Sequence, residues 1–122
     1  EIGRVEVATG EVTILAGSGD EGDADGVGDA AEICCPNGIA ISPDGSALVV
    51  ADNGNNKIRR VAVATGAVTT IAGSGEEGGA DGVGDAAEFD EPAGIAQTAA
   101  HCLWQTAATT TRSGGLRWRR ER

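Results

Sequence analysis

Several residue types are scarce or absent in this 122-residue chain, and their absence excludes whole classes of protein. The one His, His101, lies outside the repeated part of the chain described below, which therefore offers no imidazole to a metal or a nucleophile. No apolar run approaches the roughly 18 residues of a membrane span, so no spanning helix is expected. Met is absent and the chain begins at Glu1, so the missing signal peptide predicts no compartment.

Aromatic and basic residues are also few. One Phe, two Trp and no Tyr stand against 20 Gly, which is typical of short strands and tight turns around a small aliphatic core. Residues 1–96 hold 18 acids and 4 bases, whereas residues 97–122 hold 1 acid and 5 bases, and the formal net charge is −10. Because the acidic body repels phosphate, we expect neither nucleic acid nor a membrane as a partner.

The three cysteines predict no disulfide framework. Cys34, Cys35 and Cys102 are odd in number and lack the CxxC spacing of metal and redox sites. Cys34 and Cys35 also stand where the second copy of the repeat has Asp90 and Glu91.

A repeat of 56 residues organises the sequence. The segment Val12–Ile33, VTILAGSGDEGDADGVGDAAEI, returns as Val68–Phe89, VTTIAGSGEEGGADGVGDAAEF, and the match extends over residues 4–40 and 60–96. Repeats of this length are units that stack on one another, and stable stacks need three or more. We therefore expect this chain to be part of a longer one.

Each period is predicted to hold four short strands separated by turn residues. The predicted strands are Val5–Val7, Val12–Leu15, Gly38–Ile41, Ala47–Ala51, Lys57–Val63 and Val68–Ala72. Alternation and β-branching predict five buried side chains, Ile39, Ile41, Val50, Ile58 and Ile71. The predicted fold is all-β, a β-propeller fragment of about two antiparallel four-stranded blades with Gly38–Ile41 as an innermost strand.

The run Pro36–Val61, PNGIAISPDGSALVVADNGNNKIRRV, resembles an NHL repeat, and TGAVTTIAGSG with DGVGDAAEF resembles the long-blade variety of that family. The resemblance covers residues 1–96 and implies a propeller, commonly six-bladed, that serves mainly as an interaction platform. Val49 stands where the family usually has an aromatic residue. Ile33-Cys34-Cys35 replaces a Phe-polar-polar segment, so weaker packing is expected there.

The match to the repeat ends after Ala96. Suitable codons can be assigned to Gln97–Leu103 so that skipping two bases changes the reading frame and gives Asp-Gly-Ser-Ala-Leu-Phe-Val. The same frame continues into further sequence of the repeat. We therefore interpret residues 97–122 as the product of a frameshift or misjoined exon and expect them to be disordered, and the isolated chain to be marginally stable or to aggregate. The alternative is a basic, Trp-bearing arm, Arg112–Arg122, for nucleic acid or an acidic membrane.

The acidic loop Glu21–Glu32 matches an EF-hand calcium loop at five positions, with Glu21 in place of the first Asp. The flanking segments are not helices, and Gly79 replaces Asp23 in the second copy. We therefore expect these acids to cap turns and solvate the loop, without binding calcium. Asp29 is predicted to cap one helical turn that ends in the apolar Ile33 or, in the second copy, Phe89.

No other motif predicts a catalytic, cofactor-binding or metal site. Ser18 and Ser74 lie in Gly-Ser-Gly without the G-x-S-x-G elbow, and acids follow where a phosphate loop needs a helix N-terminus or Lys. Asp52 and Asn56 are predicted to bond their own backbone in a turn.

Two functions remain from these observations. The first is a non-catalytic NHL-type propeller fragment that presents its loops to a protein partner, with no cofactor. The alternative is a fragment of a metal-dependent propeller hydrolase or lactonase of the gluconolactonase-like kind, whose central metal needs acids, Asn or His on several inner strands. The inner strand Gly38–Ile41 offers none of these.

Overall fold

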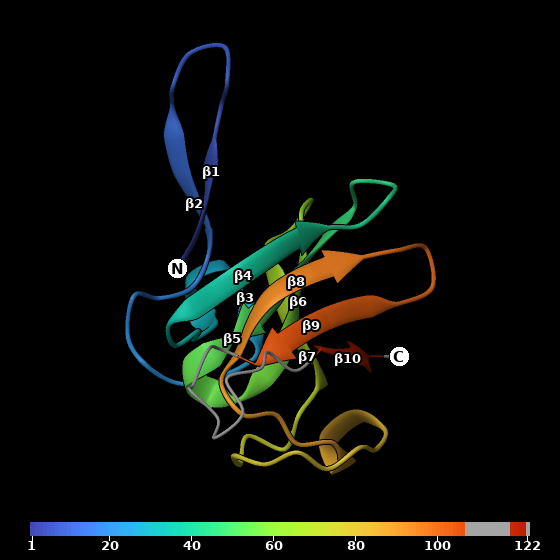
Figure 1. Ribbon diagram of the computed structural model, residues 1–122. Coiled ribbons are helices and arrows are strands. Elements are labelled where there is room, and N and C mark those ends of the chain that lie inside the picture. Colours follow the sequence, from blue (N-terminus) through green and yellow to red (C-terminus); the bar gives the residue numbers. More distant parts are fainter. Residues whose placement is uncertain (107–117, 122) are drawn as a thin grey trace.

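A computed structural model describes residues 1–106 and the backbone of residues 118–121 (Figure 1). Its strands form three antiparallel sheets of two, five and three strands, in the orders β1-β2, β3-β7-β6-β5-β4 and β10-β9-β8. Within these described residues no helix is long and apolar enough to cross a membrane.

The central sheet forms one blade. Its main strands are β4 (Pro36–Ile41), β5 (Ala47–Asp52), β6 (Lys57–Ala62) and β7 (Ala67–Ala72), which confirms the four strands predicted for this stretch and their order. A fifth strand, β3 (Gly26–Val27), comes from the predicted loop and pairs with β7 through Gly26 and Val68. The blade therefore has five strands where four were predicted, because Gly26–Val27 of the acidic loop pairs with β7 at the edge of the sheet.

The first sheet is a hairpin of β1 (Ile2–Val5) and β2 (Val12–Ala16). The prediction of a strand at Val5–Val7 was wrong, because the Glu6 amide donates to the Glu11 carbonyl oxygen at 2.8 Å and closes the turn there. In the repeat, β1 and β2 correspond to β6 and β7, the outer strands of a blade.

The third sheet contains β8 (Pro92–Gln97), β9 (Cys102–Thr106) and β10 (Trp118–Glu121). The expected disorder is therefore wrong for residues 97–106 and 118–121, whereas residues 107–117 and 122 lie outside the described residues. Trp118–Glu121 pairs with β9 in the same order as Ile58–Val61 pairs with β5. This sheet thus reproduces the first three strands of a blade, β4-β5-β6.

Apolar side chains cover both faces of the central sheet. One cluster joins it to the first hairpin, and its members are Ile2, Ala16, Ala31, Ile33, Val50, Val61 and Val68. The other joins it to the third sheet, and its members are Val49, Ala51, Ile58, Ala72, Ala87, Phe89 and Trp104. Phe89 meets Trp104 edge to face, with ring centroids 4.7 Å apart. The tail residue Trp104 is therefore part of the core.

Val50 and Ile58 are buried as predicted, and Ile71 is partly buried. Ile39 and Ile41 are not, since 51% and 59% of their surfaces are exposed. Both lie on β4, the edge strand of the blade, on the face that β8 does not cover.

A 3-10 turn lies at Gly28–Ala30, and again at Gly84–Ala86, so the turn predicted over Asp29–Ile33 begins one residue earlier and ends before Ile33. Asp29 does not cap it, because the preceding residue is Val27 and no side chain bonds to the turn's first amides. The apolar anchors are confirmed: Ile33 is 5% exposed and Phe89 1%.

Candidate functional site

The acidic loop is held on the blade by a buried arginine. Arg59 is fully buried, and its Nη1 donates to the Glu32 carbonyl oxygen at 2.9 Å while its Nη2 donates to the Ala24 carbonyl oxygen at 3.1 Å. The same guanidinium pairs with the Asp52 carboxylate at 2.7 Å and with Asp25 at 2.9 Å. One cation therefore binds the loop at three points and the end of β5 at a fourth.

Asp52 is buried with Arg59. The prediction that it bonds the backbone of its own turn is wrong, because its carboxylate bonds the Cys34 amide and the side chains of Arg59 and Asn55. Its carboxylate accepts hydrogen bonds from the Cys34 amide at 2.9 Å and from Asn55 Nδ2 at 2.7 Å. Asn56 also bonds at a distance, since its Oδ1 accepts from the Glu91 amide at 2.8 Å. Both residues connect segments that are far apart in the sequence.

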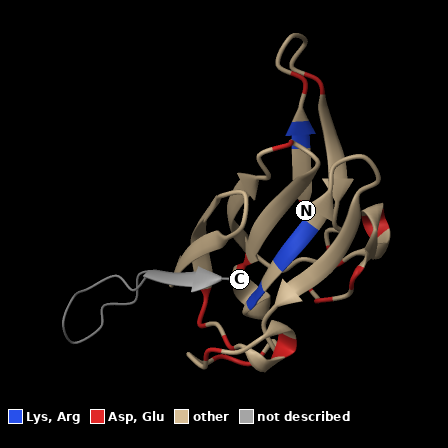
Figure 2. Ribbon diagram, turned by 90° about the vertical axis from the view of Figure 1, so that its right-hand side faces the viewer, with Lys and Arg blue, Asp and Glu red and all other residues tan. Residues whose placement is uncertain are grey.

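The calcium-like positions of the loop carry carboxylates that face cations. Asp23 accepts a hydrogen bond from Lys57 Nζ at 2.8 Å, and this bond and the lysine charge lower the pKa of Asp23. Asp25 accepts from Arg59 and, at 3.0 Å, from Thr70 Oγ1. Figure 2 shows acidic residues mostly on loops and turns, and Lys and Arg on strands. In the part of the chain that the structure describes, no three His, Cys, Asp or Glu side chains are grouped to hold a metal ion.

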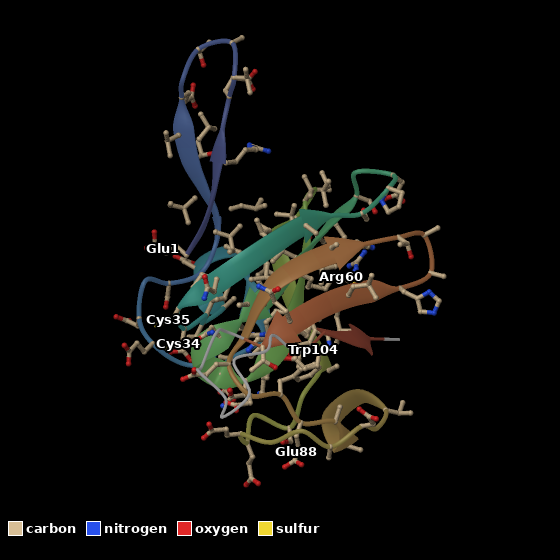
Figure 3. The ribbon with its side chains drawn as sticks, in the orientation of Figure 1. Glu1, Cys34, Cys35, Arg60, Glu88 and Trp104 are labelled. Carbon is tan, nitrogen blue, oxygen red and sulfur yellow. The ribbon has the colours of Figure 1, made fainter. Side chains whose placement is uncertain are left out.

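The candidate site is a groove of about 450 Å³ between the central blade and the third sheet. Its rim is built by two hairpin loops, Ser42–Ser46 between β4 and β5 and 98–101 between β8 and β9. The residues lining it are Ser42, Pro43, Asp44, Ser46, Ala47, Val49, Arg60, Ile71, Gln97, Ala99 and Cys102. We call this the inter-blade groove, and Figure 3 labels one of its lining residues, Arg60.

Two polar side chains that line the inter-blade groove, Arg60 and Gln97, differ in their accessibility. Arg60 is exposed and, over residues 1–106, forms no ion pair. The Gln97 side-chain oxygen Oε1 is buried and has no hydrogen-bond partner. A buried acceptor without a donor costs about 1–3 kcal/mol, and an atom without exposed surface offers no contact to a ligand.

The third polar group, Asp44, is already satisfied. It accepts hydrogen bonds from Ser42 Oγ at 2.7 Å, from the Ser46 amide at 3.0 Å and from Ser46 Oγ at 2.7 Å. These bonds lower the pKa of Asp44 from 3.8 to about 2. Since Ser42 donates directly to the carboxylate with no imidazole between them, this pair is not the acid–base arrangement of a serine nucleophile.

Sequence reasoning had assigned no site, and it passed over both Arg60 and Gln97. The adjacent Arg59 and Arg60 point to opposite faces of β6, so one is buried under the loop and the other lines the groove. Alternation separates the two arginines, but only the packing of the third sheet shows which face carries a groove. Of the acids, Asn or His that the metal-dependent alternative requires, the described inner strand β4 carries Asn37 alone and β8 carries none.

Comparisons with known proteins support the propeller architecture. No family model matches the chain. The chain is 36% identical over 106 residues to Protein SUPPRESSOR OF QUENCHING 1, chloroplastic, from Arabidopsis thaliana, a match that spans 80% of this chain and 10% of that protein. A crystal structure of an auxiliary nutrient binding protein from Bacteroides thetaiotaomicron superposes with a TM-score of 0.67 at 26% identity, covering 84% of this chain and 28% of the other. This chain is a β-propeller fragment of about two blades and spans a minor part of both relatives.

Proposed function

We propose that this chain is part of an NHL-type β-propeller that binds a protein partner and carries out no catalysis. The 56-residue repeat, the NHL-like text of Pro36–Val61 and the blade topology support this assignment. The hydrolase alternative needs acids, Asn or His on several inner strands, and the described inner strands offer one such residue, Asn37 on β4.

The observation that carries the proposal is the exposed Arg60 guanidinium on the wall of the inter-blade groove. A guanidinium can bind a carboxylate through paired hydrogen bonds. Apolar walls from Val49 and Ile71 suit an apolar side chain next to this contact. An acidic peptide segment supplies both features, and hairpin loops on a rigid sheet are a common place for such recognition.

A peptide selection tests this function directly. A random peptide library is selected against the purified chain, and the recovered peptides are measured by fluorescence polarisation. We expect peptides that contain Asp or Glu, and we expect Arg60→Glu to weaken their binding about tenfold or more, because a charge-assisted hydrogen bond contributes about 1.5–3 kcal/mol.

The matched control is Arg4→Glu, the same change at the repeat-equivalent arginine, which is exposed on β1 and does not line the groove. Binding by this variant should equal that of the wild type. Recovered peptides that lack acids, or that bind Arg60→Glu as tightly as the wild type, would refute the groove as the binding site.

A further inference from the structure

Two adjacent thiols meet at the segment that enters the central blade. Cys34 and Cys35 directly precede β4, and the Cys34 thiol donates to Cys35 Sγ with the two sulfur atoms 3.7 Å apart (Figure 3). Successive side chains of an extended chain point to opposite sides. Cys35 instead has a φ of 56°, in the left-handed region that residues other than Gly seldom adopt. The chain turns there, and the two sulfur atoms lie in contact.

The two thiols differ in exposure. Cys35 is exposed, whereas Cys34 is half-buried against Gly54, where an added Cβ would meet Cys34 Sγ at 2.5 Å. The hydrogen bond between the thiols, partial desolvation and the nearby charges of Glu21 and Asp52 raise the pKa of Cys34. Cys34 therefore keeps its proton, and Cys35 is the thiol that an oxidant in solution meets first.

The second copy of the repeat shows that this exposure persists when a blade precedes the segment. Glu91 stands at the position of Cys35 and also has a left-handed φ, of 46°. Its amide donates to Asn56 Oδ1 of the central blade at 2.8 Å, and Glu91 is nevertheless exposed. A blade packed before β4 in the same way therefore leaves the Cys35 side chain accessible.

The backbone of Cys34 is bonded to the buried ion pair that holds the acidic loop Glu21–Glu32. The Cys34 amide donates to Asp52 Oδ1 at 2.9 Å, and the Cys34 carbonyl oxygen accepts from the Gly54 amide at 2.8 Å. Asp52 pairs with Arg59, which binds two carbonyl oxygens of the loop. A change of conformation at Cys34 therefore acts on the loop through Asp52 and Arg59.

We propose that Cys34 and Cys35 form a thiol–disulfide exchange site whose co-substrate is a low-molecular-weight disulfide, and that closing the Cys34–Cys35 disulfide loosens the acidic loop. Cys35 loses its proton and its sulfur attacks one sulfur of the small disulfide; the S–S bond breaks, and the departing small thiolate takes up the proton. Cys34 then attacks Cys35 Sγ, and the second small thiolate departs with the proton of Cys34. Two protein thiols are oxidised by two electrons, and one small disulfide is reduced to two thiols.

The disulfide formed in this way is readily reduced. Adjacent Cα atoms are about 3.8 Å apart, which is less than the separation of about 4.4–6.8 Å that disulfides usually span, and such departures make the bond easier to reduce. The small ring includes the peptide group whose carbonyl oxygen accepts from Gly54, so closing it disturbs that hydrogen bond. The proposal does not rest on peptide binding, because neither Cys34 nor Cys35 lines the inter-blade groove.

Peptide mapping after treatment with glutathione disulfide tests the exchange. The reduced chain is incubated with the probe, its remaining thiols are alkylated, and trypsin releases Cys34 and Cys35 on the peptide Val5–Lys57 and Cys102 on Val61–Arg112. We expect Val5–Lys57 to lose two hydrogens and to carry neither glutathione nor an alkyl group, and a reductant should restore both thiols. The Cys102 peptide is the control for a thiol without an adjacent cysteine and should carry glutathione or the alkyl group. A Val5–Lys57 peptide that keeps both thiols, or that retains glutathione, would overturn the exchange site.

Two single variants separate the roles of the thiols and exclude random oxidation of an unfolded chain. Cys34→Ser should accumulate glutathione on Cys35, because no second thiol remains to release it. Cys35→Ser should react at least about tenfold more slowly, since only the half-buried, protonated Cys34 is left in the segment. Equal rates in the two variants would refute the assigned roles.

Hydrogen exchange tests the link to the acidic loop, and the second copy of the loop is the matched control. The Glu32 amide donates to the Ala24 carbonyl oxygen at 2.9 Å, and the Glu88 amide makes the same bond to Ala80 at 2.9 Å in a copy without cysteines. Oxidation should speed exchange at Glu32 by about tenfold or more and leave Glu88 unchanged. Equal changes at both amides, or unchanged exchange at Glu32 in a chain that holds the disulfide, would refute the coupling.

Discussion

Removing the Asp52 carboxylate should destabilise the chain far more than removing the Asp25 carboxylate, although both pair with Arg59. Asp52 is fully buried and lies 2.7 Å from the guanidinium, whereas the side chain of Asp25 is 51% exposed at 2.9 Å. Asp52→Ala leaves a buried cation without its nearest partner, which costs about 3–5 kcal/mol. Asp25→Ala breaks a pair that water screens, and such pairs contribute at most about 1 kcal/mol.

The difference can be measured by urea unfolding followed by far-ultraviolet circular dichroism. Complete domains of this size are stable by about 5–15 kcal/mol and this fragment is expected to be less stable, so Asp52→Ala removes most or all of its free energy of unfolding. It also leaves the Cys34 amide and Asn55 Nδ2 without their acceptor. If Asp52→Ala does not fold, Asp25→Ala must still fold for the reasoning to stand. Equal losses in the two variants, or a loss below about 1 kcal/mol for Asp52→Ala, would refute it.

Three further predictions follow from other parts of the molecule. Phe89→Ala should lower the free energy of unfolding by about 3–5 kcal/mol in urea, because its ring is 1% exposed and packs on Trp104, and a loss under about 1 kcal/mol would contradict that packing. Millimolar calcium should not raise the melting temperature, since a ligand of the folded state must stabilise it, and a rise abolished by Asp25→Ala and Glu32→Ala would overturn this expectation. Asp44 should titrate near pH 2 by NMR. Because its pKa is lowered on folding, its hydrogen bonds stabilise the folded chain fully above the unfolded pKa of 3.8, and this stabilisation is lost as the pH falls towards 2. Titration near pH 3.8 would contradict the serine contacts.

The sequence by itself determined the order of the strands and the kind of fold. Turn residues, alternating aliphatic residues and an exact spacing between two copies are local signals, and they predicted four strands of the central blade close to their observed bounds. The same signals placed Ile33 and Phe89 inside, because each ends an otherwise polar loop next to the sheet. The local sequence was sufficient for these features because the strands and turns of one repeat unit pack mainly on residues that lie close to them in the sequence.

The tertiary structure decided which faces are covered. Ile39 and Ile95 have the same place in the repeat, yet Ile95 meets the central blade and Ile39 faces an open cleft. Arg59 is buried only because loop carbonyls 27 and 35 residues away surround its guanidinium. Trp104 lies outside the repeat text and still fills the core, because a buried strand position needs an apolar side chain at the right alternation and does not depend on the family pattern. These outcomes depend on partners distant in the chain, which no local pattern encodes.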